Sequence, residues 1–372
     1  MTQPNREALP SSYVVTGVLA TVFVVLSAFA VSMPFGPKTY ITWVAFVWMT
    51  AVPAQIVMGL QWHFKHPAWA ARLQQPVKGL VFLGLTVAAM PLAGAFLYFV
   101  PGRGVGPTPM LIMATIMSVV ATFWIVVVWR CWPLTVLIKS AATLGIGTWV
   151  LAYALGYFIF RVFFNFGFAA SAPFYNSAAD PGGALNAWTA LVYFVTTSAI
   201  IVAARLFDLW PIPALYGARH PAIFGIYASI YVLIISVALM SLFTKMLHWD
   251  LVDYMVRVPV SLIFGVLIVS NMMHFQLFRN SLQPQKGVFL LALTVAVAIG
   301  MQALYRGIAP LLAGAPLPEG GPHYERELWV ATALLGVTFP LIIVVSGYFD
   351  FWPFLRTTND HHGTDPISES KA

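Results

Sequence analysis

Two short stretches of this sequence combine histidine with acidic residues, which is the side-chain set of many metal sites. The stretch HWDLVD and the stretch HYERE both read His, aromatic, acid. Imidazole and carboxylate groups together suit zinc, copper or iron, so the two stretches predict a metal site if they meet. The candidate ligands are His248, Asp250, Asp253, His323 and Glu325. The alternative is ion pairing, because Asp253 and Arg257 have the four-residue spacing of a helical salt bridge.

A second candidate is a pair of histidines, each followed by phenylalanine. His63 and His274 both precede a Gln-Pro-x-Lys-Gly turn, so related segments place them in matching positions. Two imidazoles brought together in this way could ligate a haem iron or another transition metal. The alternative is that each histidine lies at a helix end and faces lipid headgroups.

The amino-acid composition indicates the class of protein in which these residues lie. The chain has 372 residues, 60% of them hydrophobic and only 8% charged, against about a quarter charged in soluble domains. Its net charge of +7 comes from basic residues scattered singly, which argues against nucleic acid as a partner. A single cysteine, Cys131, rules out an intramolecular disulfide or a multi-cysteine cluster in this chain. The expected partner is the lipid bilayer.

Ten apolar runs of about 20 residues predict ten transmembrane helices, because lipid offers no partner to unpaired backbone groups. The runs are Tyr13–Ser32, Ile41–Trp62, Gly79–Val100, Thr108–Trp129, Ala141–Phe163, Asn186–Ala204, Ala222–Phe243, Val258–Phe278, Gly287–Tyr305 and Leu328–Tyr348. The fold class is therefore all-α, with a transmembrane domain over residues 13–348 between tails at 1–12 and 349–372. Lys and Arg number twelve on the side of the termini and seven on the other. This bias predicts both termini in the cytoplasm, and a bacterial inner membrane.

The chain contains nearly the same segment twice. Residues 75–88 read QPVKGLVFLGLTVA and residues 283–296 read QPQKGVFLLALTVA, and nine of the fourteen positions are identical. These segments begin the third and ninth helices, which run in the same direction, so they predict duplicated helical hairpins. Five hairpins with both termini inside resemble the architecture of the tellurite-resistance and plant slow-anion-channel group. The resemblance concerns helix arrangement and includes no sequence motif.

Few polar residues lie within the predicted spans. Gln55, Thr197, Asn271 and Gln302 could line a solute path, although hydrogen bonding between helices explains them equally well. No Asp or Glu lies at mid-membrane depth, which argues against a carboxylate ion relay. The leading hypothesis is a transporter or channel for a small solute. The alternatives are a membrane-embedded metal- or haem-binding redox protein or enzyme subunit, and a structural subunit of a larger complex.

Overall fold

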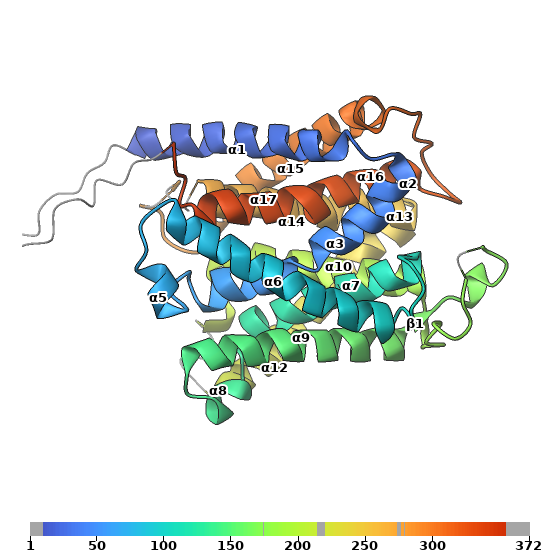
Figure 1. The fold of residues 1–372 in the computed structure, drawn as a ribbon, viewed down its shortest axis with the longest axis horizontal. Helices are drawn as coiled ribbons and strands as arrows, with labels where there is room; N and C mark the ends of the chain where they lie inside the picture. Colours follow the sequence, from blue (N-terminus) through green and yellow to red (C-terminus); the bar gives the residue numbers. More distant parts are fainter. Residues whose placement is uncertain (1–9, 174, 214–219, 274–276, 279, 355–372) are drawn as a thin grey trace, which may run out of the picture.

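The computed structural model describes residues 10–173, 175–213, 220–273, 277–278 and 280–354, and these are helical almost throughout (Figure 1). Ten helical segments are long and apolar enough to cross a membrane. The predicted all-α fold with ten spans is confirmed. The strands of the described chain are β1 (Phe164–Asn165) and β2 (Leu185–Asn186), a short parallel pair in one connecting loop.

We number the spans S1 to S10 in chain order. The first five consist of α1 (Pro10–Ser32) in S1; α2 (Pro37–Thr39), η1 (Tyr40–Val44), α3 (Ala45–Met49), α4 (Val52–Ile56) and η2 (Val57–Gln61) in S2; α6 (Val77–Phe99) in S3; α7 (Pro109–Phe123) and η3 (Trp124–Val128) in S4; and α9 (Ala141–Phe163) in S5. Short helices α5 (Ala68–Ala71), α8 (Leu134–Leu137) and η4 (Gly167–Ala169) lie in connecting loops.

The last five spans follow the same alternation. They consist of α10 (Ala187–Ala204) and η5 (Arg205–Phe207) in S6; α12 (Pro221–Ser241) and η6 (Leu242–Met246) in S7; α13 (Leu251–Met255), η7 (Val256–Val260), α14 (Ser261–Leu267) and η8 (Ile268–Met272) in S8; α15 (Gln285–Ala313) in S9; and α16 (Glu325–Ala331), η9 (Thr332–Thr338), α17 (Phe339–Ile343) and η10 (Val344–Tyr348) in S10.

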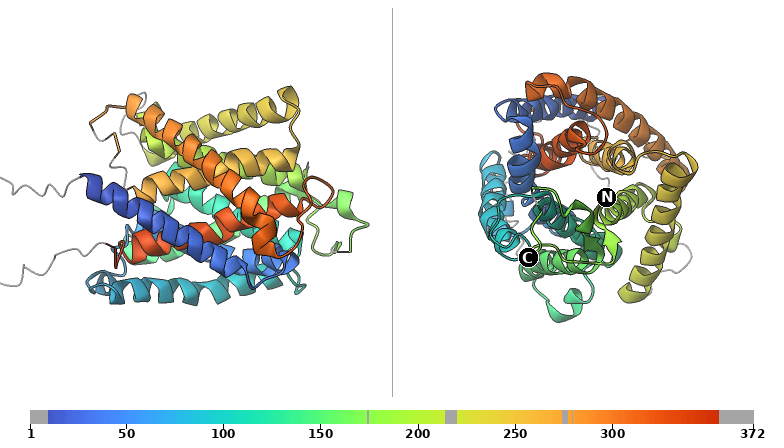
Figure 2. Two further views of the ribbon diagram at one scale, coloured as in Figure 1. Left: turned by 90° about the horizontal axis from the view of Figure 1, so that it is seen from above. Right: turned by 90° about the vertical axis from the view of Figure 1, so that its right-hand side faces the viewer.

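Odd and even spans occupy two concentric rings. In the even spans, 67 to 78% of the residues in the most apolar window are buried, against 22 to 44% in the odd spans. Neighbouring even spans contact one another around the axis, and S10 closes the ring by contacting S2. The view along the axis in Figure 2 shows this arrangement. We call the even spans the inner ring and the odd spans the outer ring.

The α-helices of the inner spans contain interruptions, whereas the outer spans are mostly regular α-helix. Four inner spans contain π-helical turns, in which backbone carbonyls lose their usual partner. Nearby hydroxyl groups compensate: the Ser261 hydroxyl donates to Val256 O at 2.8 Å, and the Thr338 hydroxyl donates to Ala333 O at 2.6 Å. Gln55 Nε2 likewise donates to the carbonyl of Pro340 on S10. Side chains thus restore hydrogen bonds that an apolar environment would otherwise leave unmade.

S1 begins and S10 ends at the same end of the bundle, which we call the terminal face; the opposite end is the distal face (Figure 1). Towards the terminal face, each outer span crosses an inner span at a glycine. A Cβ atom on that glycine would lie 2.2 to 2.8 Å from an atom of the last residue of the inner span or of the residue that follows it, which is too close for a side chain unless something shifts. The pairs are Gly17 with Met272, Gly79 with Phe349, Gly145 with Trp62, Gly225 with Trp129, and Gly287 with Phe207.

The boundaries of two spans differ most from the sequence prediction. S8 begins at Leu251, so the residues before Val258 form its first turns. The Asp250 side chain causes this early start, because it accepts hydrogen bonds from the backbone N–H groups of Val252 and Asp253. S9 continues past Tyr305 to Ala313. Its last turns can include the charged Arg306 because acidic residues of neighbouring segments neutralise it.

Candidate functional site: an axial cavity and its distal mouth

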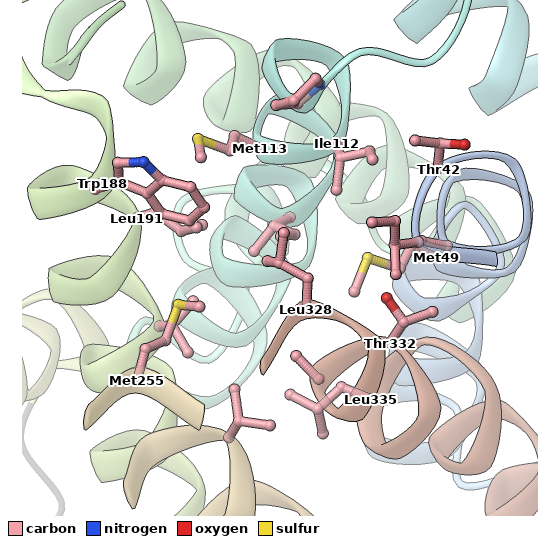
Figure 3. A pocket seen from close by; sticks show the side chains of 17 residues that line it. Thr42, Met49, Ile112, Met113, Trp188, Leu191, Met255, Leu328, Thr332 and Leu335 are labelled. Atoms are coloured by element: carbon pink, nitrogen blue, oxygen red, sulfur yellow. The ribbon is translucent and has the colours of Figure 1, made fainter. Parts of the chain in front are cut away.

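A cavity of about 130 Å³ lies on the axis in the distal half of the bundle (Figure 3). All five inner spans contribute side chains to its wall. The lining residues are Ile41, Thr42, Ala45, Met49, Pro109, Ile112, Met113, Ile116, Trp188, Leu191, Val195, Met255, Val260, Leu328, Ala331, Thr332 and Leu335. The cavity is therefore a property of the ring as a whole.

A second axial cavity, of about 50 Å³, continues the first towards the terminal face. Met49, Ile116, Val195 and Leu335 line both cavities, which places the two next to each other. The residues that line only the second are Val52, Val119, Val120, Phe123, Ser198, Ile263 and Phe339. Together the two cavities follow the axis from the distal mouth to about mid-depth.

The side chains of these walls limit what they can do chemically. Neither cavity is lined by an acidic, basic, histidine or cysteine side chain. The polar groups are the hydroxyls of Thr42, Thr332 and Ser198 and the indole of Trp188. Such walls can admit a small solute, but their side chains offer no acid, base or metal ligand.

Ion pairs of S8, S9, S10 and the loop before S10 lie beside the distal mouth of the first cavity. The Arg306 guanidinium, from S9, lies 3.2 Å from Asp253 on S8 and 2.5 Å from Glu319 in the loop before S10. It also lies 3.8 Å from Glu327 on S10, a carboxylate that is only 2% exposed. Arg326 forms a further ion pair with Glu319. Arg306 thereby connects one outer span to two inner spans and a loop.

This cluster adjoins the cavity lining directly. Glu327 precedes the lining residue Leu328. The Tyr324 hydroxyl donates to Asp250 at 2.9 Å, and its ring packs edge-on against the lining residue Trp188. The hydrogen bond from Arg306 lowers the pKa of Glu319, and burial together with Asp250 raises the pKa of Tyr324 to about 12. The lowered pKa favours ionised Glu319 and the raised pKa favours protonated Tyr324 at neutral pH, and these are the forms that make the hydrogen bonds described above.

The two stretches predicted to bind metal lie next to each other, and the hydrogen bond and ion pairs described above connect them. Asp250 bonds to Tyr324, and Asp253 pairs with Arg306 and, at 2.7 Å, with Arg257. The predicted helical salt bridge between Asp253 and Arg257 is confirmed. His248 and His323 are exposed, and Glu325 is half-buried. Within the residues that the structure describes, no three His, Cys, Asp or Glu side chains lie close enough together to hold a metal.

The other predicted residues are distributed over both rings. His63 is exposed at the terminal face, and His274 lies outside the described residues. Gln55 is buried against Pro340, and Thr197 accepts a hydrogen bond from Trp124 Nε1. Asn271 bonds to Leu267 O and to the Ser270 hydroxyl, and Gln302 is half-buried on the outer span S9. The walls of the two axial cavities consist of other residues.

Sequence reasoning missed the cavity lining and the Arg306 cluster. Lining residues such as Met49, Ile112 and Leu335 have no chemical mark that separates them from ordinary packing residues. A usable signal did exist for the cluster, since acidic residues gather on the distal side and Arg306 follows the predicted end of S9 at Tyr305. This signal indicated where the charged residues gather but not which of them form ion pairs.

Ten apolar helices in two rings, with cavities along the axis of the inner ring, define a polytopic integral membrane protein. Comparison with models of known protein families, with curated proteins and with solved structures finds no match to this chain. Its function must therefore be argued from the axial cavities and their surroundings.

Proposed function

We propose that this protein is a transporter or channel for a small solute, and that the solute moves along the axis of the inner ring. The observation that carries the proposal is the pair of adjoining cavities, whose walls combine residues of S2, S4, S6, S8 and S10. A packing defect between two helices would be lined by those two helices. A cavity shared by a closed ring of five is the expected form of a solute path.

The interrupted inner helices support this proposal. Most π turns, and the hydroxyl-compensated carbonyls, lie in spans that surround the axis, and irregular backbone at membrane depth is tolerated where it lines a cavity. The second cavity, whose wall includes Phe123 and Phe339, is the region where such turns would allow side chains to move apart.

We further propose that the termini face the cytoplasm of a bacterial cell and that the hairpins are duplicated. The excess of basic residues on the terminal side supports the orientation. The duplication is supported by one matched contact. Gly79 meets Phe349 and Gly287 meets Phe207, so both copies of the repeated segment pack in the same way on an inner span.

Flux through purified protein in liposomes tests the proposed path. Ala331 lines the first cavity, whereas Ala303 is exposed on the outer surface of S9. We expect wild-type protein to release small anions, weak acids or neutral solutes faster than empty vesicles, and Ala331→Trp to abolish that release. Ala303→Trp, the matched control, should retain it. Absence of wild-type release for every solute class, or equal release by the two variants, would overturn the proposal.

A further inference from the structure

A third cavity lies on the outside of the bundle, between the outer spans S3 and S5. Its volume is about 390 Å³, which is within the range of about 300–1,000 Å³ that small-molecule sites have. Residues of the inner span S2 form its floor, and residues of S3 and S5 form its walls. Small residues on all three spans leave this space open, and they are Ala54, Ala88, Ala89, Ala142 and Gly145. We call this cavity the lateral groove.

The lateral groove opens towards the hydrocarbon of the membrane. Leu92 on S3 and Ile146 on S5 both line it, and they are 66% and 56% exposed on the outer surface of the bundle. The lining residues include no charged side chain, and their side-chain N–H groups are the indoles of Trp62 and Trp149. A groove of this composition takes up a hydrocarbon chain from the bilayer, because its walls would otherwise lack van der Waals contacts.

S8 and S9, which adjoin the second copy of the repeated segment, leave no such space at the matching place. The π turns η2 in S2 and η8 in S8 are each preceded, three residues earlier, by Ala54 and Gly265 respectively. A Cβ atom at Gly265 would lie 2.5 Å from Thr294 O, so the S9 backbone packs directly on S8. Ala54 carries a Cβ atom, and S3 packs less closely on S2 than S9 does on S8. The groove is therefore particular to the first copy.

Two lysines lie beside the terminal end of the lateral groove. Trp62 Nε1 donates to Ala141 O at 2.8 Å, and this bond joins the end of S2 to the start of S5. Lys65 follows Trp62 by three residues, and Lys139 precedes Ala141 by two. Both lysines are exposed, and the loops that contain them, from S2 to S3 and from S4 to S5, include no Asp or Glu. The apolar groove thus ends at a positively charged rim.

We propose that the lateral groove binds one acyl chain of an anionic phospholipid, whose phosphate interacts with Lys65 and Lys139. Along S5 the groove extends from Ala142 to Trp149, which is about two turns of helix into the membrane. A phospholipid with its headgroup at the terminal face directs its acyl chain along the same line. Lysines at the membrane surface attract anionic headgroups, so the rim selects this lipid class. The site is independent of the proposed solute path.

Native mass spectrometry of the purified protein, titrated with phosphatidylglycerol or phosphatidylcholine, tests the site. We expect the wild type to bind phosphatidylglycerol about tenfold more tightly than phosphatidylcholine. Ala88→Trp fills the groove and should abolish this binding. Ala296→Trp, at the matching position of the repeated segment on S9, should retain it. Both alanines are exposed, so neither substitution needs space inside the bundle. Equal binding by the two variants would overturn the site.

Charge variants keep the proposal testable if Ala88→Trp does not fold. The double variant Lys65→Gln with Lys139→Gln changes exposed loop residues, and it should bind the two lipids equally. Lys245→Gln, exposed at the distal face, should keep the wild-type preference for phosphatidylglycerol. Persistence of the preference in the double variant, or equal binding of both lipids by the wild type, would overturn the selection of an anionic lipid.

Sizing by light scattering tests a second copy of this chain as the competing occupant. We expect Ala88→Trp to keep the oligomeric state of the wild type while it loses the bound phosphatidylglycerol. If Ala88→Trp instead changes the oligomeric state and keeps the lipid, the groove is an interface between copies and the proposal fails.

Discussion

Gly287 lies directly against the ring of Phe207, and a Cβ atom at Gly287 would be 2.2 Å from Cδ1 of that ring. Hydrogen bonds fix the same junction: Gln283 Nε2 donates to Leu206 O, and Gln283 Oε1 accepts from the Gly287 N–H group. The first copy of the repeated segment does the same, since Gln75 Nε2 donates to Tyr348 O. The repeated Gln-Pro-x-Lys-Gly segment therefore attaches an outer span to the end of an inner span.

Adding a methyl group at this junction should destabilise the protein. Gly287→Ala forces the Phe207 ring or the S9 backbone to move, and overpacking of this kind costs about 1–3 kcal/mol. Gly300, on the same helix, provides the control, because a Cβ atom there would have no neighbour within 4 Å. Gly300→Ala should be neutral or stabilising, because alanine favours the helix. Thermal unfolding in detergent measures both, and equal Tm values for the two variants would contradict the close contact.

Two threonines at matching positions of the repeat should respond differently to valine. The Thr86 hydroxyl lies 2.6 Å from the Tyr348 hydroxyl, both of them buried, so Thr86→Val removes this partner and leaves Tyr348 a weak sulfur contact. This should cost about 1 kcal/mol. Thr294 is equally buried, but its hydroxyl has no hydrogen-bond partner among the described residues. Thr294→Val should therefore be neutral or stabilising. A larger loss of Tm for Thr294→Val than for Thr86→Val would show that the hydrogen bond carries little stability.

Removing the Arg306 charge should be far more damaging than removing the Arg257 charge. Arg306→Gln leaves Glu327, only 2% exposed, without its cation, and an uncompensated buried charge costs about 3–5 kcal/mol. Arg257 is 40% exposed, so Arg257→Gln should cost less than about 1 kcal/mol. Denaturation in detergent compares the two variants. The double variant Arg306→Gln with Glu327→Gln should recover part of the loss, and failure to recover would place the effect elsewhere.

Acid should weaken the distal cluster through Glu319. The hydrogen bond from Arg306 lowers the pKa of this carboxyl in the folded protein below its ordinary value of 4.5. The folded state thus binds the proton more weakly than the unfolded state does. The resulting stabilisation is present above pH 4.5 and is lost as the pH falls through the folded pKa. Glu319→Gln should show a shallower fall in Tm with acid than wild type, whereas Glu325→Gln should follow the wild-type curve.

The ten spans could be predicted because a lipid bilayer requires long apolar helices, and each of the ten apolar runs in the sequence meets this requirement. The division of these spans into an inner and an outer ring could not be predicted from the sequence. S7 has a mean hydropathy of 2.3 and is 28% buried, while S10 has 2.4 and is 72% buried. Packing residues and lipid-facing residues are equally apolar, so hydropathy does not separate Leu335 on the axis from Ile234 on the surface.

The candidate site was predictable only in its charged part. The acidic and basic residues of the distal loops were visible, but Asp253 and Arg306 are 53 residues apart, and only the closed ring brings them together.

The glycine junctions also set an order of assembly. Through these glycines S3 packs on S10 and S1 packs on S8, so two of the first three spans to be synthesised complete this packing only near the end of translation. Until then, the glycine-marked faces of S1 and S3 must remain in contact with lipid or with another protein of the insertion machinery. Biogenesis of this protein therefore ends with a closing step, in which the last hairpins complete the packing of the first.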